Sequence, residues 1–157
     1  MNRRIWALIA LTLCMTVAAL GADKPDFSGN WKLNVSKSDL GQMPVPDKWE
    51  MKVEHKDPAL KSVTTSVGQM GERVMEANYK TDGTETINKG FGNSETKSTA
   101  KWDGSILAIA TQAEFQGNKM EILSRWNLAA DGKTLTVEQT MKSDRGEFTT
   151  KRVLDKQ

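Results

Sequence analysis

Phe27-Ser28-Gly29-Asn30-Trp31-Lys32-Leu33 is the stretch of this chain that decides its fold. Phe27, Gly29 and Trp31 fall on one face of an extended strand, and polar residues separate them. This period of two is typical of a strand with one face buried and the other in water. A glycine two positions before a large ring, at the start of a chain rich in tight turns, predicts the opening strand of a small β-barrel.

The first 22 residues have the layout of an export signal. Arg3 and Arg4 supply the positive charge, Ile5–Leu20 form an apolar run, and small residues in 19–22 offer a cleavage site. A membrane anchor is the alternative because the run approaches spanning length, but no stop-transfer charges follow it. Cys14 follows a leucine, which is a poor match to a lipoprotein signal. We expect residues 1–22 to be removed and residues 23–157 to act in the periplasm or the extracellular medium.

Charge and cysteine content narrow the classes of function. Removal of residues 1–22 takes away Arg3, Arg4 and Cys14, the only cysteine. The rest of the chain carries equal numbers of basic and acidic side chains and cannot form a disulfide. A neutral, evenly mixed surface argues against nucleic acid and against a polybasic membrane contact. We therefore expect a single domain over 23–157 that is monomeric, binds no nucleic acid and has no stable membrane span after cleavage.

Prolines and turn pairs divide the chain into strands. All four prolines lie at or before Pro58, so the long remainder can pair as continuous sheet. Turn signals recur at intervals typical of hairpins: Asp57-Pro58, Gly68–Gly71, Asp82-Gly83, Gly90–Asn93, Asp103-Gly104, Gly117-Asn118, Asp131-Gly132 and Asp144–Gly146. Helix signals are nearly absent after residue 22, and Gly41, Pro44 and Pro46 make 38–49 an irregular loop.

Alternation between the turns predicts antiparallel strands. Apolar and polar residues alternate over 49–55, 120–128 and 135–141, and the pattern is weak over 84–88. Repeated alternation of this kind gives an all-β fold, a single antiparallel up-and-down β-barrel of about 8–10 strands. Closure into a barrel removes both edges of such a sheet. A β-sandwich is the alternative.

Several positions that should face the interior are small or hydroxylated: Thr65, Thr96, Ser98, Ala100, Thr111, Ser124 and Thr150. Such linings suit a barrel with room for a ligand or water, whereas a sandwich core would fill with Leu, Ile and Val. The predicted ligand-binding set comprises larger, mostly apolar side chains: Trp49, Met51, Val53, Met75, Tyr79, Trp102, Leu107, Ile109, Phe115, Ile122, Trp126, Val137, Gln139 and Met141. Tryptophan and methionine make adaptable apolar walls, and Gln139 could fix a polar end. Alternatively, these side chains meet in the middle and leave no cavity.

The opening stretch 27–33 resembles the first strand of the calycin superfamily, the lipocalins and fatty-acid-binding proteins, and of small exported bacterial lipocalin-like proteins of uncharacterised function. Lys101-Trp102-Asp103-Gly104 is also similar to a hairpin of fatty-acid-binding proteins. The resemblance implies that Trp31 lies at the closed end of the barrel beside Gly29, with a basic residue of the last strand packed over it. Alternation over 148–154 makes Arg152 the expected partner, and we predict a cation–π contact that closes the barrel.

The chain also departs from these families. Residues 36–48 are too short and too rich in proline for their helix-turn-helix lid, and we expect them to flank or cover one end of the barrel. Those families hold a fatty-acid carboxylate with arginines on late strands and a tyrosine. Here 105–115 contains no arginine, and Leu154 stands where the tyrosine would be. The resemblance therefore predicts a fold and leaves the ligand open.

Catalytic and metal chemistry find little support. His55 is the only histidine, no nucleophile elbow is present, and a zinc site would need more nitrogen or sulfur ligands. Haem held by His55 alone is a minor alternative to a structural histidine near a turn. We expect no enzyme activity, no metal and no cofactor. The function predicted is that of an exported barrel that binds or carries a small apolar or amphipathic molecule; the alternative is an interaction module with a filled core.

Overall fold

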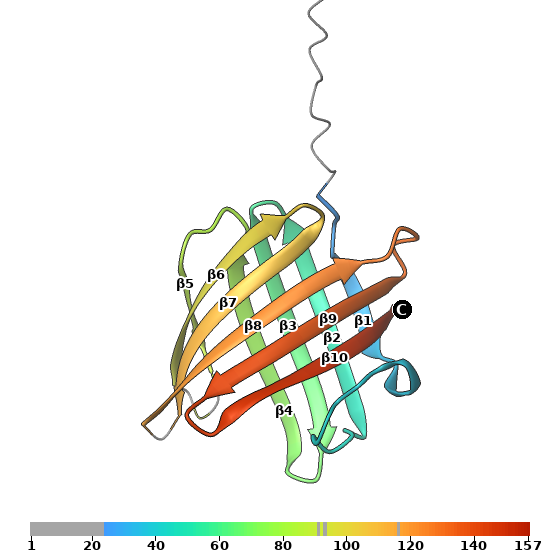
Figure 1. Cartoon of the computed structure of the whole chain (residues 1–157). Coiled ribbons are helices and arrows are strands. Elements are labelled where there is room, and N and C mark those ends of the chain that lie inside the picture. The colour runs from blue at the N-terminus through green and yellow to red at the C-terminus, as the bar shows by residue number, and fades with distance from the viewer. Residues whose placement is uncertain (1–23, 91, 93, 116) are drawn as a thin grey trace, which may run out of the picture.

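The computed structural model describes residues 24–90, 92, 94–115 and 117–157, apart from the side chain of Phe115. These residues form ten strands joined by short connections (Figure 1). The strands are β1 (Gly29–Leu33), β2 (Lys48–Lys56), β3 (Ala59–Gly68), β4 (Gly71–Lys80), β5 (Thr86–Lys89), β6 (Glu95–Asp103), β7 (Ile106–Phe115), β8 (Asn118–Leu128), β9 (Thr134–Ser143) and β10 (Gly146–Lys156). A short 3-10 helix, η1 (Val35–Lys37), follows β1. The leader expected over 1–22 lies outside the described residues.

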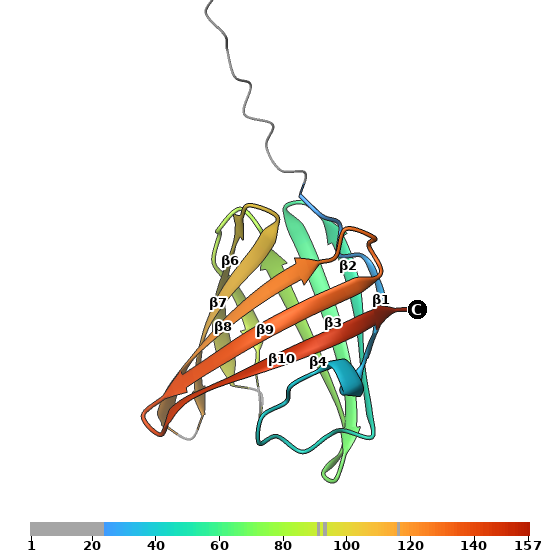
Figure 2. The same cartoon turned by 45° about the vertical axis from the view of Figure 1, so that its right-hand side comes forward.

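The strands form one antiparallel sheet in the order β4-β3-β2-β1-β10-β9-β8-β7-β6-β5. Strands that are neighbours in sequence pair with each other, except β4 and β5. In addition β1 pairs with β10, which brings the first and last strands together and curls the sheet into a barrel (Figure 2). The predicted up-and-down antiparallel barrel is therefore confirmed. Its closure is incomplete, because β4 and β5 end the sheet without a backbone ladder between them.

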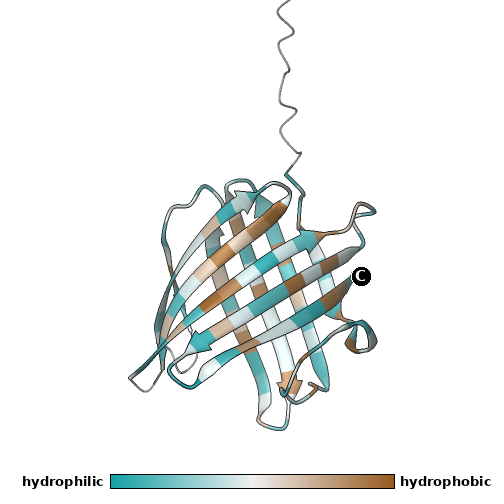
Figure 3. Ribbon diagram, viewed as in Figure 1, coloured by the Kyte–Doolittle hydropathy of each residue, from teal (hydrophilic) through white to brown (hydrophobic). Residues whose placement is uncertain are grey.

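The strands alternate as the sequence predicts, and Figure 3 shows apolar and polar bands succeeding each other along them. The weak segment 84–88 becomes the short strand β5, which starts only at Thr86. Thr65 was expected inside but lies on the outer face, since it pairs with Glu50 and Val74, while Ser62, three positions earlier and so on the other face of β3, is buried. A shift of one residue moves a side chain to the other face of a strand, so the assignment of Thr65 was wrong.

The connection 34–47 crosses the end of the barrel opposite the end where the chain enters β1 (Figure 2). Asn34 caps η1, and Asp39 then exchanges two backbone hydrogen bonds with Lys151, of 2.8 and 2.7 Å. This extended piece lies beside β10 beyond the end of β1 and buries Leu40, which is 8% exposed. The segment therefore covers one end of the barrel with the buried Leu40 and the partly buried Met43, and a short strand-like contact holds it in place.

Aromatic rings fill the opposite end, which we call the aromatic end. Phe27 and Trp31 are fully buried there, and the Trp31 indole donates a 2.9 Å hydrogen bond to the carbonyl of Phe27. The Phe27 ring stacks on Trp102 at 5.8 Å and meets the edge of Trp126 at 5.7 Å. Such contacts add to the burial energy of the rings, so this end is a packed core.

Asp57 ties the chain entering β1 to this end. Its carboxylate accepts hydrogen bonds from the Thr81 hydroxyl, from Trp102 Nε1 at 3.1 Å and from Lys24 Nζ at 2.9 Å. These bonds, that from Thr81 first, lower the pKa of Asp57 to about 2. Residues 24–28 are thereby held against β2 and β6.

The predicted contact of Arg152 with Trp31 is wrong. Lys156 Nζ lies over the Trp31 ring, 5.3 Å from its centroid, and the register pairs Trp31 with Lys156. Because β1 ends at Leu33, opposite Leu154, Arg152 lies beyond the end of β1. Gly29 does belong to this closure: its φ is +145°, and a Cβ there would approach Lys156 Cε to 2.6 Å.

Candidate functional site

The predicted interior residues divide into two groups by depth. Six of them are buried in the core that continues from the aromatic end: Met51, Val53, Leu107, Ile109, Trp126 and Val137. Tyr79 and Trp102 pack against the same core and are partly buried. In this half of the barrel the side chains meet, so the filled-core alternative describes it well.

Toward the other end, side chains that face inward become partly exposed. This group comprises Trp49, Ile122, Gln139 and Met141 of the predicted set, with the hydroxyl residues Thr64, Thr111 and Ser124. These side chains lie on the interior face of the sheet, because their cross-strand partners are buried or also face the interior. Several of them are in the middle of a strand. Since neighbouring strands shield them from outside, their exposure is to space within the barrel. This half of the interior is accessible to water.

Two members of the predicted set fall elsewhere. Met75 is on the inner face of β4, paired with Thr64, yet 51% of it is exposed because β4 is an edge of the sheet. The side chain of Phe115 lies outside the described residues. Contact of any of the predicted residues with a ligand stays a prediction.

Arg152 points into the water-accessible half. Its Nη1 donates hydrogen bonds to Gln139 Oε1 at 3.1 Å and to Thr150 Oγ1 at 3.4 Å, and its Cζ lies 5.9 Å from the Trp49 ring centroid. Among the described residues no carboxylate forms an ion pair with it. Burial lowers the pKa of Arg152, although a guanidinium stays charged at any physiological pH. The Arg152 charge inside the barrel therefore has no anionic partner in the described part of the chain.

Neutral polar groups extend from Arg152 along the adjoining strands. Gln139 Nε2 donates to Ser124 Oγ at 3.3 Å, and the hydroxyls of Ser98 and Thr111 share a 2.8 Å hydrogen bond. Ser98 is 2% exposed, so this pair reaches the deeper part of the interior. Guanidinium, amide and hydroxyl groups together carry more donors than these contacts use. The wall formed by β6–β10 therefore suits a ligand rich in acceptor oxygens.

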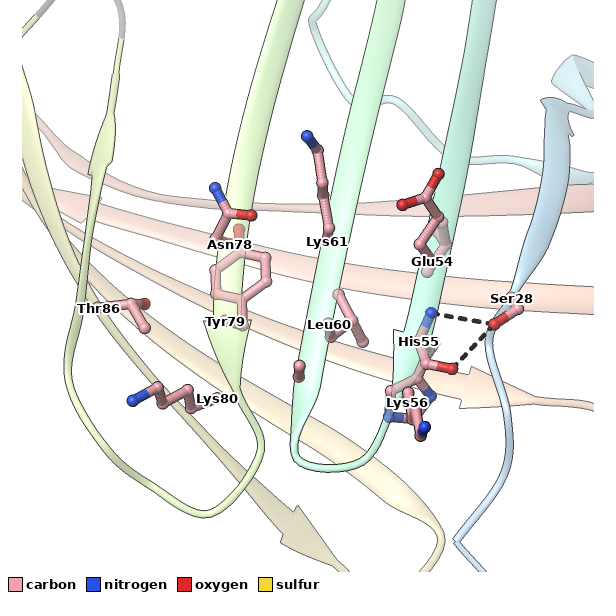
Figure 4. A pocket seen from close by; sticks show the side chains of 12 residues that line it. Ser28, Glu54, His55, Lys56, Leu60, Lys61, Asn78, Tyr79, Lys80 and Thr86 are labelled. Carbon is pink, nitrogen blue, oxygen red and sulfur yellow. Dashed lines mark hydrogen bonds between the residues drawn. The ribbon is translucent and has the colours of Figure 1, made fainter.

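A separate cavity of about 560 Å³ lies along β2, β3 and β4 near the aromatic end (Figure 4). Its inner wall is a row across three strands, since Leu60 pairs with both His55 and Tyr79. Ser28 fixes the end of β2 by donating to the His55 carbonyl at 3.1 Å and accepting from its N–H at 3.0 Å. Desolvation raises the pKa of Tyr79 to about 12, so its hydroxyl stays protonated.

The His55 imidazole is a structural group. Its side chain is 4% exposed and stacks on Phe27 at 5.6 Å, while Nδ1 accepts a 3.3 Å hydrogen bond from the Phe27 N–H. Nε2 is buried and has no hydrogen-bond partner. Burial lowers the pKa of His55, against the opposing effects of Asp26 and Asp57. Its geometry matches the structural interpretation of the lone histidine better than a ligand to haem.

Two features of the described chain bear on partners. No helix in it is long and apolar enough to cross a membrane. No group of three or more His, Cys, Asp or Glu side chains gathers there in a way that could hold a metal ion.

Sequence reasoning predicted that hydroxyl residues such as Ser98 and Ser124 and the Gln139 amide face the interior, but it missed the contact of Arg152 with that amide. Alternation did place Arg152 and Gln139 on inner faces, but it carries no information on which residue of β1 each would meet. No local sequence pattern fixes the register of β1 against β10, which pairs Trp31 with Lys156. The burial of Leu40 could not be predicted either, because the irregular connection 34–47 shows no alternation of apolar and polar residues.

Comparison with known proteins places the fold. No family model matches the sequence, and no curated protein matches it either. Among solved structures, the zebrafish ileal bile acid-binding protein complexed with cholic acid is 15% identical, covers 83% of this chain and 98% of its own, and has a TM-score of 0.59. Lipid binding protein 8 of Caenorhabditis elegans is 12% identical over 83% and 95% of the two chains, with a TM-score of 0.60. The fatty acid binding protein of Schistosoma mansoni, complexed with arachidonic acid, is 16% identical over 83% and 96%, with a TM-score of 0.53. The expected calycin-like fold is thereby confirmed.

Proposed function

We propose that this protein binds a small amphipathic molecule inside its barrel, with the anionic group of that molecule on Arg152. The observation that carries the proposal is the Arg152 guanidinium, which faces the water-accessible half of the interior and has only neutral hydrogen-bond partners among the described residues. The apolar part of the ligand would lie against Trp49, Ile122 and Met141.

The electrostatics of Arg152 support an anion. A partly desolvated charge costs free energy unless an opposite charge or several hydrogen bonds compensate it. Nη1 already holds Gln139 and Thr150, which leaves Nη2 and Nε for a carboxylate or a sulfonate. Trp49 limits the orientations of the guanidinium through its ring face. The group is therefore fixed in place before a ligand arrives.

The structural neighbours agree with this class of ligand. One neighbour was solved with cholic acid and another with arachidonic acid, both of which join an acidic group to a large apolar body. We extend the proposal to export, because residues 1–22 have the layout of a removable signal. In this role the protein is a monomeric binding or carrier protein of the periplasm or extracellular medium, and not an enzyme.

A binding titration of Arg152 variants tests the proposal. The fluorescent anion 8-anilinonaphthalene-1-sulfonate and dodecanoate are titrated against the unaltered protein, Arg152→Gln and Lys151→Gln. Lys151 is the matched control, since it lies next to Arg152 on β10 but is exposed on the outer face. Loss of a charge-assisted hydrogen bond inside the barrel should weaken binding about tenfold or more in Arg152→Gln alone.

Equal loss in both variants would show that general charge attracts the ligand and would overturn the assignment of Arg152. Absence of saturable binding by either anion to the unaltered protein would overturn the binding proposal itself. If binding is saturable, native mass spectrometry of protein purified from its own source, followed by organic extraction, identifies the class of the natural ligand.

A further inference from the structure

The sheet has one interruption, between β4 and β5. Each of these strands pairs on one side only, β4 with β3 and β5 with β6. The interruption, which we call the slot, is bridged by the side chain of Asn88. Asn88 Oδ1 accepts from the Asn78 backbone N–H at 2.7 Å, and Asn88 Nδ2 donates to the Asn78 carbonyl at 3.0 Å.

The Asn88 amide takes the place of a neighbouring strand at this point. A primary amide offers one donor and one acceptor in the same arrangement as a peptide group, so it satisfies the outward backbone of Asn78. The side chain is 8% exposed, and the Thr96 hydroxyl donates to the Asn88 carbonyl at 3.3 Å. Two hydrogen bonds from the Asn88 side chain therefore connect β4 to β5, whereas paired strands elsewhere in the sheet are joined by a ladder of backbone hydrogen bonds.

A hollow lies along the slot. Its volume is about 460 Å³, and Val74, Met75, Ile87 and Asn88 are among its lining residues. Val74 and Ile87 flank the slot on the outer surface and are each 60% exposed, whereas Met75 is on the inner face and is 51% exposed. Glu76, Asn78 and Lys89 also line this hollow, so apolar and polar side chains together border it between the outer surface and the inner face of β4.

We propose that the slot is the entrance through which an apolar or amphipathic ligand reaches the barrel interior, and that Asn88 is the latch that must release Asn78. The inference rests on the binding function proposed above. Opening any other strand pair would break a ladder of backbone bonds, and the aromatic end is filled by Phe27 and Trp31. At the other end, a ligand would have to displace the buried Leu40 and the Asp39 bridge to Lys151.

Cross-linking across the slot tests the entrance directly. Glu76 and Ile87 line the slot and are exposed, so a Glu76→Cys/Ile87→Cys pair in a Cys14→Ser background can be joined with a short bismaleimide. The matched control joins Lys61→Cys to the same Glu76→Cys across the paired strands β3 and β4, where the two native side chains form a 2.9 Å ion pair. Stopped-flow fluorescence of 8-anilinonaphthalene-1-sulfonate then gives association and dissociation rates.

Closing an entrance changes rates and leaves affinity alone. The slot cross-link should slow both association and dissociation at least tenfold, with the dissociation constant within about threefold of the uncross-linked protein. The control cross-link should change neither rate by more than twofold. Unchanged rates with the slot cross-link would overturn the proposal.

A substitution of the latch gives an independent test. Asn88→Ala should raise both rates at least fivefold, because no amide holds Asn78. Asn78→Ala is the control, since Asn78 contributes only backbone atoms to the two bonds. If Asn88→Ala does not fold, the cross-linking experiment still tests whether the slot is the entrance. Acceleration by Leu40→Ala in place of Asn88→Ala would put the entrance at the other end, and failure of the probe to bind the unaltered protein would instead count against the binding function.

Discussion

At the level of single residues, Arg152 is expected to lower the stability of the unliganded protein while it favours binding of an anion. Its guanidinium is partly desolvated and has no carboxylate partner among the described residues, so its charge is a cost to the folded state without ligand. Sites that keep such a group commonly trade stability for function.

We expect Arg152→Leu to unfold at an equal or higher urea concentration than the unaltered protein, while its affinity for dodecanoate falls. Leucine removes the desolvated charge and fills similar space against Trp49. Urea denaturation followed by tryptophan fluorescence, with and without dodecanoate, measures both effects. A variant that is clearly less stable without ligand would show that the hydrogen bonds to Gln139 and Thr150 outweigh the cost of the charge.

His55 makes stability depend on pH. Burial holds its pKa below the ordinary value of 6.5 in the folded state, although Asp26 and Asp57 oppose this and Lys24 adds to it. The unfolded chain therefore binds a proton near pH 6.5 when the folded protein does not, and the free energy of unfolding falls as pH drops below about 6.5.

Urea denaturation at pH 7.5, 6.5 and 5.5 should show this decline in the unaltered protein. His55→Phe should remove most of it, because His55 is the only histidine and the Asp57 pKa of about 2 lies well below this range. The same slope in both proteins would assign the effect to other groups.

At the level of elements, the connection 34–47 is stabilised by Leu40. This side chain is 8% exposed and belongs to the core cluster, whereas Val45 in the same segment is 59% exposed. Leu40→Ala should lower the free energy of unfolding by about 2–5 kcal/mol, as removal of buried methyl groups does. Val45→Ala should change it by less than about 0.5 kcal/mol. Equal, small effects in urea denaturation would show that the segment does not contribute to the core.

Local patterns explain which elements were predictable. Alternation identified strands such as β2 and β9, because each has one face in the core and one in water. It could not fix the end of β1, since the pattern runs on to Val35 while pairing stops at Leu33 and Val35 is 45% exposed. The partner of Trp31 depended on that end, and so did the place of Arg152. The slot could not be predicted from the sequence either, because it depends on how β4 and β5 lie relative to each other and not on the pattern within either strand.

At the scale of the whole molecule, the sheet order makes the chain a meander interrupted once. If Gln157 were joined to residue 24 by a short glycine-serine linker and the chain reopened between Gly83 and Thr84, the strands would follow one another as they lie in the sheet. Gln157 lies beside β1, since its N–H donates a 2.9 Å hydrogen bond to the Asn30 carbonyl, and the linker has to reach from there to residue 24.

We expect this permuted chain to form the same barrel and to refold faster, because fewer of its contacts are distant in sequence. Circular dichroism would verify the fold, and stopped-flow tryptophan fluorescence would compare refolding rates. Slower refolding would show that pairing of β1 with β10 is not the limiting step.

The pairing of β1 with β10 also determines the point in synthesis at which the barrel can first close. Trp31 pairs with Lys156 and Leu33 pairs with Leu154, so the sheet stays open until residues 154–156 are available to pair with β1. Until that moment both β1 and the newest strand present free edges, on which other chains can pair. Extensions fused directly after Gln157 would therefore act on the closing step itself.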